Sequence, residues 1–476
     1  MRIFDTNVQL LKYKVLKEVA ELAYENRLNE AYDIIPEKII PGPKATMRCC
    51  IYKERAIVGK RIKMALGGSK NNPNVIEVLD IACDECPVTR FTVSDSCRGC
   101  IAHRCENTCP LGAINIYEHK AVIDKEKCVE CGKCASICPY GAIRENIRPC
   151  ERSCKIKAIA MDANKKAHIN DEKCISCGAC VYQCPFGAIV DKSYITEVVD
   201  LLKNPGNNNL YAIIAPSIYC QFNYAKIGQV IKGIKALGFH HVFEAATGAD
   251  MVAHKEAKEL SEKNFLISSC CPSFVTYIEK SFPKLKDKIS HNLSPMAEIA
   301  SYIKKKDVTA KIVFIGPCIS KKVEIKRPDI KDLVDFVLTF EELQALLDSR
   351  NIIIEELEED KLDEASYFGR ILARSGGLSE AIAEVIKEEN LSFKLKAISC
   401  DNITDCKNAL LKASKSILEE NFIEGMICPG GCIGGPACLT HGPKDRTEVD
   451  KYGSLSALKT IGESLKSLNN APDNNK

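Results

Sequence analysis

Cysteine is the residue that most constrains what this chain can fold into. The sequence contains 27 cysteines, and 16 of them lie between Cys83 and Cys184. Within that segment the pattern Cys-Pro-x-Gly-Ala-Ile occurs three times, starting at Cys109, Cys138 and Cys184. Such a set is too long and too regular for a small disulfide scaffold. The segment is therefore expected to fold around repeated metal centres.

The N-terminus, the lengths of the apolar stretches and the charge balance indicate where the protein is found and which partners it lacks. The N-terminus shows no apolar core followed by a small-residue cleavage site, and no stretch reaches the roughly 18 uncharged apolar residues of a membrane span. We therefore expect a cytoplasmic protein without a membrane partner, whose reduced thiols serve metals or catalysis. A disulfide-rich exported protein is the alternative. Lys and Arg number 66 against 63 Asp and Glu, which gives no support for a nucleic-acid partner.

Two runs with the spacing Cys-x2-Cys-x2-Cys-x3-Cys-Pro are typical of bacterial ferredoxins, in which the fourth cysteine binds the other of two 4Fe–4S clusters. Zinc sites use CxxC pairs at longer separation, so zinc is the weaker interpretation. This rule predicts one cluster on Cys128, Cys131, Cys134 and Cys184, and a second on Cys174, Cys177, Cys180 and Cys138.

The remaining cysteines of the segment suggest further clusters. A looser run, Cys97, Cys100, Cys105 and Cys109, ends in the same Cys-Pro step and predicts a third cluster. Four cysteines are then left over: Cys83, Cys86, Cys150 and Cys154. Their number fits a fourth cluster, but zinc or no metal at all is an equal interpretation. The sequence thus predicts two to four accessory 4Fe–4S clusters.

The chain divides into regions of different character. Residues 1–80 carry few clues, and 81–203 form the cysteine-rich, ferredoxin-like domain. A Pro-Gly-Asn linker ends at Asn209. Residues 209–463 alternate apolar runs, at 210–215, 265–268, 312–315 and 334–339, with helical patterns. That alternation predicts an α/β domain with a largely parallel sheet. Residues 469–476 are expected to be a disordered tail.

Three loops in this last domain contain cysteine in unusual surroundings. They run from Ile267 to Phe274, from Ile315 to Glu324 and from Glu424 to Pro436. Two of them directly follow predicted strands, and Ala215-Pro216-Ser217 follows another. Because ligands gather beyond the carboxyl ends of parallel strands, these loops should meet at one site. Four of their thiolates could hold a further iron–sulfur centre: Cys271, Cys318, Cys428 and Cys432.

The three loops closely resemble the signature motifs of the iron-only (FeFe) hydrogenases, TSCCPxW, MPCxxKxxE and ExMxCxGGCxxG, over about residues 209–460. The resemblance implies an α+β ferredoxin-like iron–sulfur domain followed by an α/β FeFe-hydrogenase catalytic domain. It also implies an H-cluster, in which a 4Fe–4S cubane is joined through a cysteine to a two-iron unit with CO, CN⁻ and a dithiolate bridge. The chain differs from the family at Ser268, Phe274, Gly316 and Pro436, where Thr, Trp, Met and Gly are usual.

Matching positions assign roles by this resemblance. The four loop thiolates would ligate the cubane, and Cys432 would also bridge to the two-iron unit. Cys270 would donate and accept protons beside it. Residues that would surround the cluster are Lys321 and the Pro216-Ser217 pair, which would contact the cyanides, and Met426, which would pack on it. A solvated surface lysine is the alternative for Lys321, since Lys322 follows it.

A proton route to Cys270 is suggested by the helical pattern over 249–263. Glu256 falls inside the apolar face of this expected helix and Glu259 at its edge. A carboxylate on a buried face often has a function, although a structural ion pair with Lys or Arg is the alternative. In the family, two matching glutamates and a serine, which we place at Ser294, form the path to the relay cysteine.

The sequence therefore predicts a reversible hydrogenase, 2 H⁺ + 2 e⁻ ⇌ H2, that exchanges electrons with ferredoxin or a similar carrier. Its partners would include the maturation proteins that insert the two-iron unit. Three other interpretations remain open. These are an H2 sensor with slow turnover, a hydrogenase-like iron–sulfur assembly protein without the two-iron unit, and a simple electron carrier.

Overall fold

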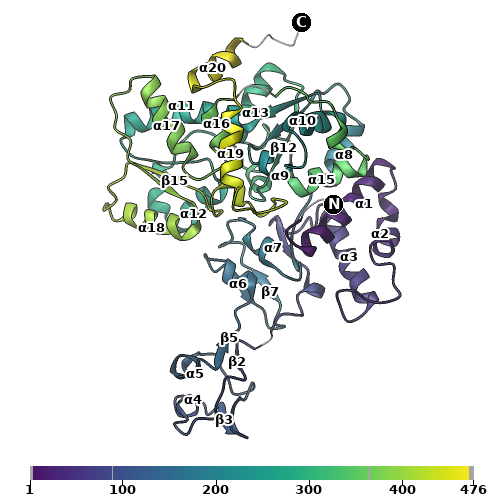
Figure 1. Cartoon of the computed structure of the whole chain (residues 1–476), viewed down its shortest axis with the longest axis vertical. Coiled ribbons are helices and arrows are strands. Elements are labelled where there is room, and N and C mark those ends of the chain that lie inside the picture. Colours follow the sequence, from purple (N-terminus) through teal and green to yellow (C-terminus); the bar gives the residue numbers. More distant parts are fainter. Residues whose placement is uncertain (1–3, 88, 363–364, 471–476) are drawn as a thin grey trace.

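The computed structural model describes residues 4–87, 89–362 and 365–470. Figure 1 shows an elongated molecule in which two small iron–sulfur units extend below a large α/β domain, with three N-terminal helices at the side. The predicted fold class, ferredoxin-like iron–sulfur units followed by an α/β catalytic domain, is confirmed. None of the helices in the described ranges has the length and apolar character needed to cross a bilayer.

Residues 1–80 do not stand apart from the rest. Their helices are α1 (Asn7–Tyr24), α2 (Ala31–Ile39) and α3 (Ile51–Ala65), with a 3-10 turn at Leu28–Glu30. Helix α1 packs on helices of the large domain, and its buried side chains join the same apolar core. Strand β1 (Ile76–Val78) pairs antiparallel with β8 (Ile189–Asp191). The predicted boundary at residue 80 therefore separates β1 from the unit to which it belongs.

The cysteine-rich segment folds as two successive units instead of one domain. The outer unit contains β2 (Phe91–Val93), α4 (Arg104–Asn107), β3 (Ile114–Tyr117), β4 (Lys120–Ile123), α5 (Lys133–Ile137) and β5 (Ile143–Glu145). The inner unit contains β1, a 3-10 turn (Asp80–Ala82), α6 (Pro149–Ser153), β6 (Ile159–Met161), β7 (Ala167–Ile169), α7 (Ala179–Gln183) and β8. Each unit is held by two antiparallel strand pairs, β2–β5 with β3–β4 and β1–β8 with β6–β7. Helix α8 (Ile195–Lys203) leads into the large domain.

The large domain contains two parallel sheets where the sequence predicted one. The first has the order β10-β9-β12-β13, and the second β11-β15-β14. Their bounds are β9 Leu210–Ile214, β10 His241–Glu244, β11 Leu266–Ile267, β12 Lys311–Gly316, β13 Phe336–Thr339, β14 Ala397–Cys400 and β15 Phe422–Gly425. Strand β9 is buried at every position, as expected of a parallel strand covered on both faces.

Helices surround both sheets. They are α9 (Ile218–Gln221), α10 (Ile227–Ala236), α11 (Ala245–Lys263), α12 (Pro272–Ser281), α13 (Pro295–Lys306), α14 (Lys321–Glu324), α15 (Phe340–Ser349), α16 (Tyr367–Ile371), α17 (Gly377–Glu388), α18 (Ile403–Ser414), α19 (Asp445–Ser454) and α20 (Ile461–Asn470), with 3-10 turns at Pro283–Lys288, Ile354–Glu356 and Cys432–Gly434. Local sequence fixes several ends. At α15, for example, Thr339 and Glu342 form a capping box. Of the predicted disordered tail, Asn469 and Asn470 belong to α20, and 471–476 lie outside the described residues.

Candidate functional site

Four groups of four cysteines lie along the two iron–sulfur units. In the outer unit each group lines a cavity of its own. Site 1 is Cys97, Cys100, Cys105 and Cys138, and site 2 is Cys109, Cys128, Cys131 and Cys134. Figure 1 places α4, which carries Cys105 of site 1, nearer the free end of the molecule than α5, which carries Cys134 of site 2. Site 1 is therefore the outermost site.

The inner unit holds the other two groups, as the electrostatics of the thiols show. Burial raises the pKa of Cys150 to about 12, and the nearby thiolates add to that rise. Those neighbours define site 3: Cys83, Cys86, Cys150 and Cys184. Burial also raises the pKa of Cys180 well above its ordinary value, and the thiolates of Cys177, Cys174, Cys154 and, least, Cys150 add to that rise. All of these except Cys150 line one cavity with Cys180, and these four define site 4: Cys154, Cys174, Cys177 and Cys180.

This grouping corrects the predicted ligand exchange. The sequence rule joined Cys138 to the run at 174–180 and Cys184 to the run at 128–134. In the structure Cys138 instead completes site 1 and Cys184 completes site 3. The physical reason is that the strand pairs close residues 91–145 into one unit, so the fourth cysteine of a run reaches only the other site of its own unit. Cys83, Cys86, Cys150 and Cys154, whose role the sequence left open, all belong to sites.

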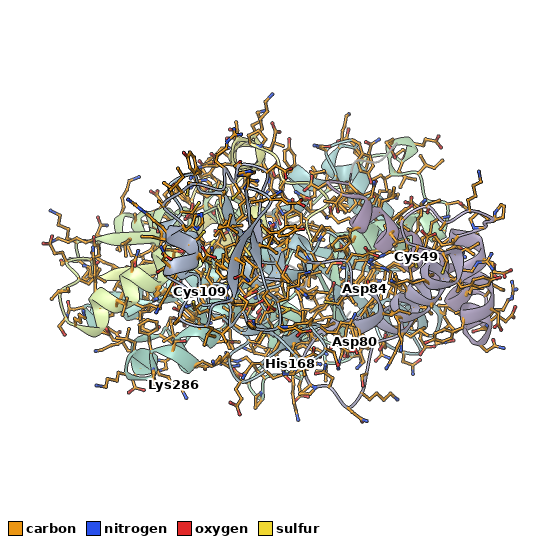
Figure 2. All side chains as sticks on the ribbon, turned by 90° about the horizontal axis from the view of Figure 1, so that it is seen from below. Cys49, Asp80, Asp84, Cys109, His168 and Lys286 are labelled. Carbon is orange, nitrogen blue, oxygen red and sulfur yellow. The ribbon has the colours of Figure 1, made fainter. Side chains whose placement is uncertain are left out.

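The sites suit clusters of several irons. Within the described ranges, no three His, Cys, Asp or Glu side chains are arranged to hold a single metal ion. A 4Fe–4S cluster instead requires four thiolates around its outside, which is what each group provides. Cys49 takes no part in any site. Figure 2 shows it among the N-terminal helices, far from Cys109 of the outer unit.

The three cysteine loops of the large domain meet at the carboxyl ends of the two sheets. Pro216 and Ser217 follow β9, and Cys318 follows the neighbouring strand β12. In the other sheet, Cys270 and Cys271 follow β11, and Cys428 follows its neighbour β15. The convergence expected from the sequence is therefore present, but two sheets build it, each contributing two adjacent strand ends.

Four thiols at this convergence form a fifth group, which we call the central site: Cys271, Cys318, Cys428 and Cys432. Burial raises the pKa of Cys318 to about 11 and that of Cys432 to about 12, and each is raised further by its thiolate neighbours in the group. Four such thiols ionise together only when positive charge is supplied. A bound iron–sulfur cluster supplies that charge, so the donor set fits one.

Site 4 lies beside the central site. The thiolate of Cys177 helps to raise the pKa of Cys428, and the thiolate of Cys271 helps to raise the pKa of Cys177. Gly178, at a φ of 77°, allows this approach, because a side chain there would meet Pro436 at 2.6 Å and Ile319 at 2.7 Å. Pro436, a departure from the family pattern, thus lies against Gly178 of the inner unit, as Ile319 does.

Lys321 is buried at the central site, which excludes the solvated alternative. Its ammonium donates to Ser294 Oγ at 2.9 Å and pairs with Glu324 at 2.5 Å. Burial lowers its pKa, but Glu324 and the thiolates of Cys318 and Cys432 outweigh burial, so the net pKa is raised and the side chain stays cationic. On the neighbouring strand end, Ser217 Oγ is buried and has no hydrogen-bond partner among the described residues. A buried cation and an orphaned hydroxyl suit an anionic group bound between them.

Cys270 and Glu256 lie together behind this site. Cys270 is buried, with Sγ 3.9 Å from Ser268 Oγ. The Glu256 carboxylate is fully buried on α11 and accepts from the backbone N–H and the hydroxyl of Ser269, both at 3.4 Å. Burial raises the pKa of Glu256 to about 7, against the smaller opposite effect of its hydrogen bonds. The predicted alternative, a structural ion pair, finds no support, because Ser269 is not basic and the second carboxylate oxygen, Oε2, has no hydrogen-bond partner among the described residues.

Glu259 continues the path toward solvent. Its carboxylate accepts from Ser290 Oγ at 3.0 Å and Asn292 Nδ2 at 2.8 Å, and lies 3.0 Å from His291 Nδ1. Although burial raises the pKa of Glu259, hydrogen bonds from Lys263, His291 and Ser290 outweigh it, and the net pKa is lowered. Ser290 also lies close enough to Glu256 to lower its pKa slightly, against the larger effect of burial. It therefore connects the two carboxyl groups.

Ser290 takes the place that the sequence analysis gave to Ser294. Ser294 caps α13 and accepts from Lys321, away from the two glutamates. Ser290 is fixed by its backbone N–H, which donates to Ile267 O at 2.8 Å beside the Cys270 loop. The two serines are only four residues apart in one loop. Nothing in their sequence spacing distinguishes them, whereas their contacts do: Ser290 with Ile267 and Glu259, and Ser294 with Lys321.

Two other departures from the family pattern have local explanations. Phe274, in place of Trp, packs against Gly425, where an added Cβ would lie 2.1 Å from the ring. Gly316, in place of Met, lies under the ring of Phe314, where an added Cβ would be 2.7 Å away. Met426 is buried in the same apolar cluster as Cys270. The lining of this site has therefore changed while the cysteines have not.

Comparison with known families agrees with this arrangement. Residues 208–436 match the model for the iron only hydrogenase large subunit, C-terminal domain. Residues 208–436 therefore belong to the iron-only hydrogenase family. Two further segments, 121–144 and 167–190, match the 4Fe-4S binding domain. The first of these segments overlaps sites 1 and 2, and the second overlaps sites 3 and 4.

Three relatives show the range of this family. The chain is 29% identical to Iron hydrogenase 1 of Clostridium pasteurianum over 69% of this chain and 66% of that protein, slightly less than two thirds of its length. It is 28% identical to the periplasmic Fe hydrogenase large subunit of Nitratidesulfovibrio vulgaris, over 71% of this chain and 91% of that protein. It is also 24% identical to the cytosolic Fe-S cluster assembly factor narfl of Danio rerio, over 42% of this chain and 63% of that protein. These comparisons show that the chain is similar to iron-only hydrogenases and to hydrogenase-like iron–sulfur proteins.

Proposed function

We propose that this iron-only hydrogenase family member catalyses 2 H⁺ + 2 e⁻ ⇌ H2 at an H-cluster held by the central site. The observation that carries the proposal is the position of Cys270. This thiol follows directly after strand β11 and precedes Cys271 of the central site, and Glu256 is close enough to raise its pKa. A protein that only stores or transfers an iron–sulfur cluster does not need a buried series of titratable side chains that ends beside the cluster.

The residues around the central site have separate tasks. When bound, an H-cluster supplies the redox centre at which protons and electrons combine. Cys271, Cys318, Cys428 and Cys432 would hold it, with Cys432 as the bridge to the two-iron unit. Lys321 and Ser217 would bind its anionic ligands, with Pro216 beside Ser217 and Met426 packed against the site.

Protons reach Cys270 through this chain's own side chains. Glu256 holds a proton near neutrality, since its pKa is raised to about 7. Ser290 and Glu259 connect it to His291, whose side chain is 73% exposed. A group that titrates near the working pH both accepts and releases a proton readily, which suits Glu256 to the inner step of the relay.

Electrons would travel along sites 1 to 4. Site 1 lies at the free end and site 4 beside the central site, so four 4Fe–4S clusters would form one line (Figure 1). Ferredoxin or a similar carrier would deliver or remove electrons at site 1. The cytoplasmic location predicted from the sequence and the need for maturation proteins remain part of this proposal.

Infrared spectroscopy of anaerobically matured protein tests the proposal. We expect CO and CN⁻ stretching bands that shift under H2. The Cys270→Ser variant should keep the bands and lose turnover, whereas Cys49→Ser, a control at an exposed thiol outside all five sites, should change neither. Absence of the bands in protein with full iron content and supplied maturation factors would refute the hydrogenase proposal.

A second function is favoured by a specific observation. The similarity to the Danio rerio assembly factor shows that related chains include proteins named for iron–sulfur cluster assembly. In that case the central site would hold a cubane alone, and the infrared experiment would give no CO or CN⁻ bands. An H2 sensor would instead show the bands with low turnover. Cys270 and the buried Glu256 favour the hydrogenase over both.

A further inference from the structure

The beginning of the chain reaches the junction between the inner iron–sulfur unit and the large domain. Gln9 of α1 donates from its amide to Cys438 O at 2.9 Å, in the loop that follows Cys432. Lys12 pairs with Asp191 of β8 at 2.5 Å and with Glu341 of α15 at 2.6 Å. The first turns of α1 therefore contact both parts that must stay together for electrons to pass between site 4 and the central site.

Asp5, just before α1, makes the most informative contact. One oxygen of its carboxylate, Oδ2, lies 2.7 Å from His441 Nδ1 and accepts from the Tyr182 hydroxyl at 3.1 Å. The rings of His441 and Tyr182 also pack, with centroids 4.4 Å apart. Tyr182 belongs to α7, between Cys180 of site 4 and Cys184 of site 3. Asp5 and His441 thus tie the N-terminal segment to the helix that carries the inner clusters.

The other nitrogen of His441 contacts the loop that follows Cys432. His441 Nε2 lies 2.9 Å from Gly435 O, and the Gly435 N–H donates to Cys432 O at 3.0 Å. Cys432 is the residue expected to bridge the two halves of the H-cluster. A single imidazole therefore joins the loop of Cys432 to the N-terminal segment and to α7.

The protonation state of this imidazole follows from its partners. Both are acceptors, a carboxylate oxygen and a backbone carbonyl, and neutral histidine has only one N–H to donate. His441 makes both bonds only as the doubly protonated cation. The other titratable groups that influence this cluster are Asp445 of α19, which interacts with His441, and Cys438, which interacts with Tyr182. Loss of the second proton would break one bond and remove the charge.

We propose that His441 is a positioning residue that, when protonated, clamps the Cys432 loop against the N-terminal segment and the site 4 helix. With the imidazolium in place, the loop from Gly435 to His441 is held, and a positive charge borders the cavity that is lined by the site 4 thiols and by Cys428. With neutral imidazole, the loop loosens and that charge is absent. Electron delivery to the central site would therefore depend on pH. This last part rests on the proposed function, while the clamp itself does not.

Hydrogen–deuterium exchange on the wild-type holoprotein tests the clamp without any turnover. Between pH 5.5 and pH 8, the range in which histidines change charge, the amides of Gly435, Cys438 and Leu439 should exchange about tenfold faster at the higher pH after correction for the intrinsic rate. That factor corresponds to about 1.4 kcal/mol, close to the contribution of one hydrogen bond to a charged group. Protection that does not depend on pH would overturn the proposal.

Variants separate the clamp from general stability. Asp5→Asn and His441→Gln should show the fast exchange already at pH 5.5. The control is His254→Gln, which removes a histidine–carboxylate pair with Glu389 of similar exposure, outside the junction. It should leave these amides unchanged. If the variants match wild type at both pH values, the clamp is refuted.

A redox readout tests the link to electron transfer. In wild type, the reduction potential of the site 4 cluster, followed by EPR, should be more positive at pH 5.5 than at pH 8, because a nearby cation favours the reduced state. His441→Gln should remove this difference. A pH-dependent clamp with an unchanged potential would leave the positioning of the loop intact but refute its effect on electron transfer. Absence of CO and CN⁻ bands would instead refute only the proposed hydrogenase reaction.

Discussion

Replacing Glu256 by Gln should make this protein more stable at alkaline pH and at the same time inactivate it. The carboxyl group is fully buried on α11, and its pKa is raised from 4.5 to about 7. Because the folded-state value lies above the unfolded one, the wild-type group costs no stability at low pH. The cost appears as the pH rises above 4.5 and is complete above about 7. Each pKa unit corresponds to about 1.36 kcal/mol, so the shift amounts to roughly 3 kcal/mol at pH 8.

The glutamine amide keeps the shape of the side chain and carries no charge. The difference in stability between Glu256→Gln and wild type should therefore grow by about 2.5 kcal/mol from pH 5 to pH 8. For a domain of this size we expect the gap in apparent Tm to widen by about 5–10 °C, measured at one scan rate on matched holoproteins. Loss of the inner proton carrier should reduce H2 evolution by about 10²- to 10⁴-fold.

The exposed Glu262→Gln on the same helix is the matched control and should show neither effect. A Glu256→Gln protein that is no more stable than wild type at pH 8 would contradict the burial argument. A variant that keeps its turnover would contradict the relay. Since the two effects have opposite signs, general misfolding cannot produce both.

Three further predictions concern other residues. Ser290→Ala should slow H2 evolution more than Ser294→Ala does, because Ser290 donates to Glu259 and lies close to Glu256, whereas Ser294 accepts from Lys321; equal rates in an electrode assay would refute the corrected path. Cys83→Ala should lower the iron content by about four atoms per chain in a colorimetric assay, and unchanged iron would remove this cysteine from site 3. Gly425→Ala should lower the apparent Tm by several degrees, since its Cβ would lie 2.1 Å from the Phe274 ring, and an unchanged Tm would show that the ring moves freely.

Part of the site could be predicted from the sequence because it depends on local spacing. The four thiols of the central site, Cys270 and Lys321 are carried by short loops directly after strands, and the parallel pairing brings those strand ends together. Glu256 could be found because one helical period decides which side chains face inward. In these cases the chemistry is set by residues within one element and the turn that follows it.

Other features depend on contacts between distant segments. The spacing of a cysteine run does not show which site its fourth cysteine joins. Only the strand pairs show that Cys138 and Cys184 each bind a site within their own unit. Ser290 and Ser294 are likewise distinguished by tertiary contacts, since Ser290 bonds to Ile267 and Glu259 and Ser294 accepts from Lys321. The burial of Lys322, paired with Asp191 and Glu342 at 2.9 Å, likewise requires two domains to meet.

The sequence by itself determined which atoms this protein offers to iron, because ligand spacing and strand–loop order are local properties of the chain. The tertiary structure decided which cysteines share a site and which serine connects the glutamates. It also decided how the first residues of the chain clamp the junction through Asp5 and His441. These are choices among chemically equivalent side chains, and only packing between segments far apart in sequence distinguishes them.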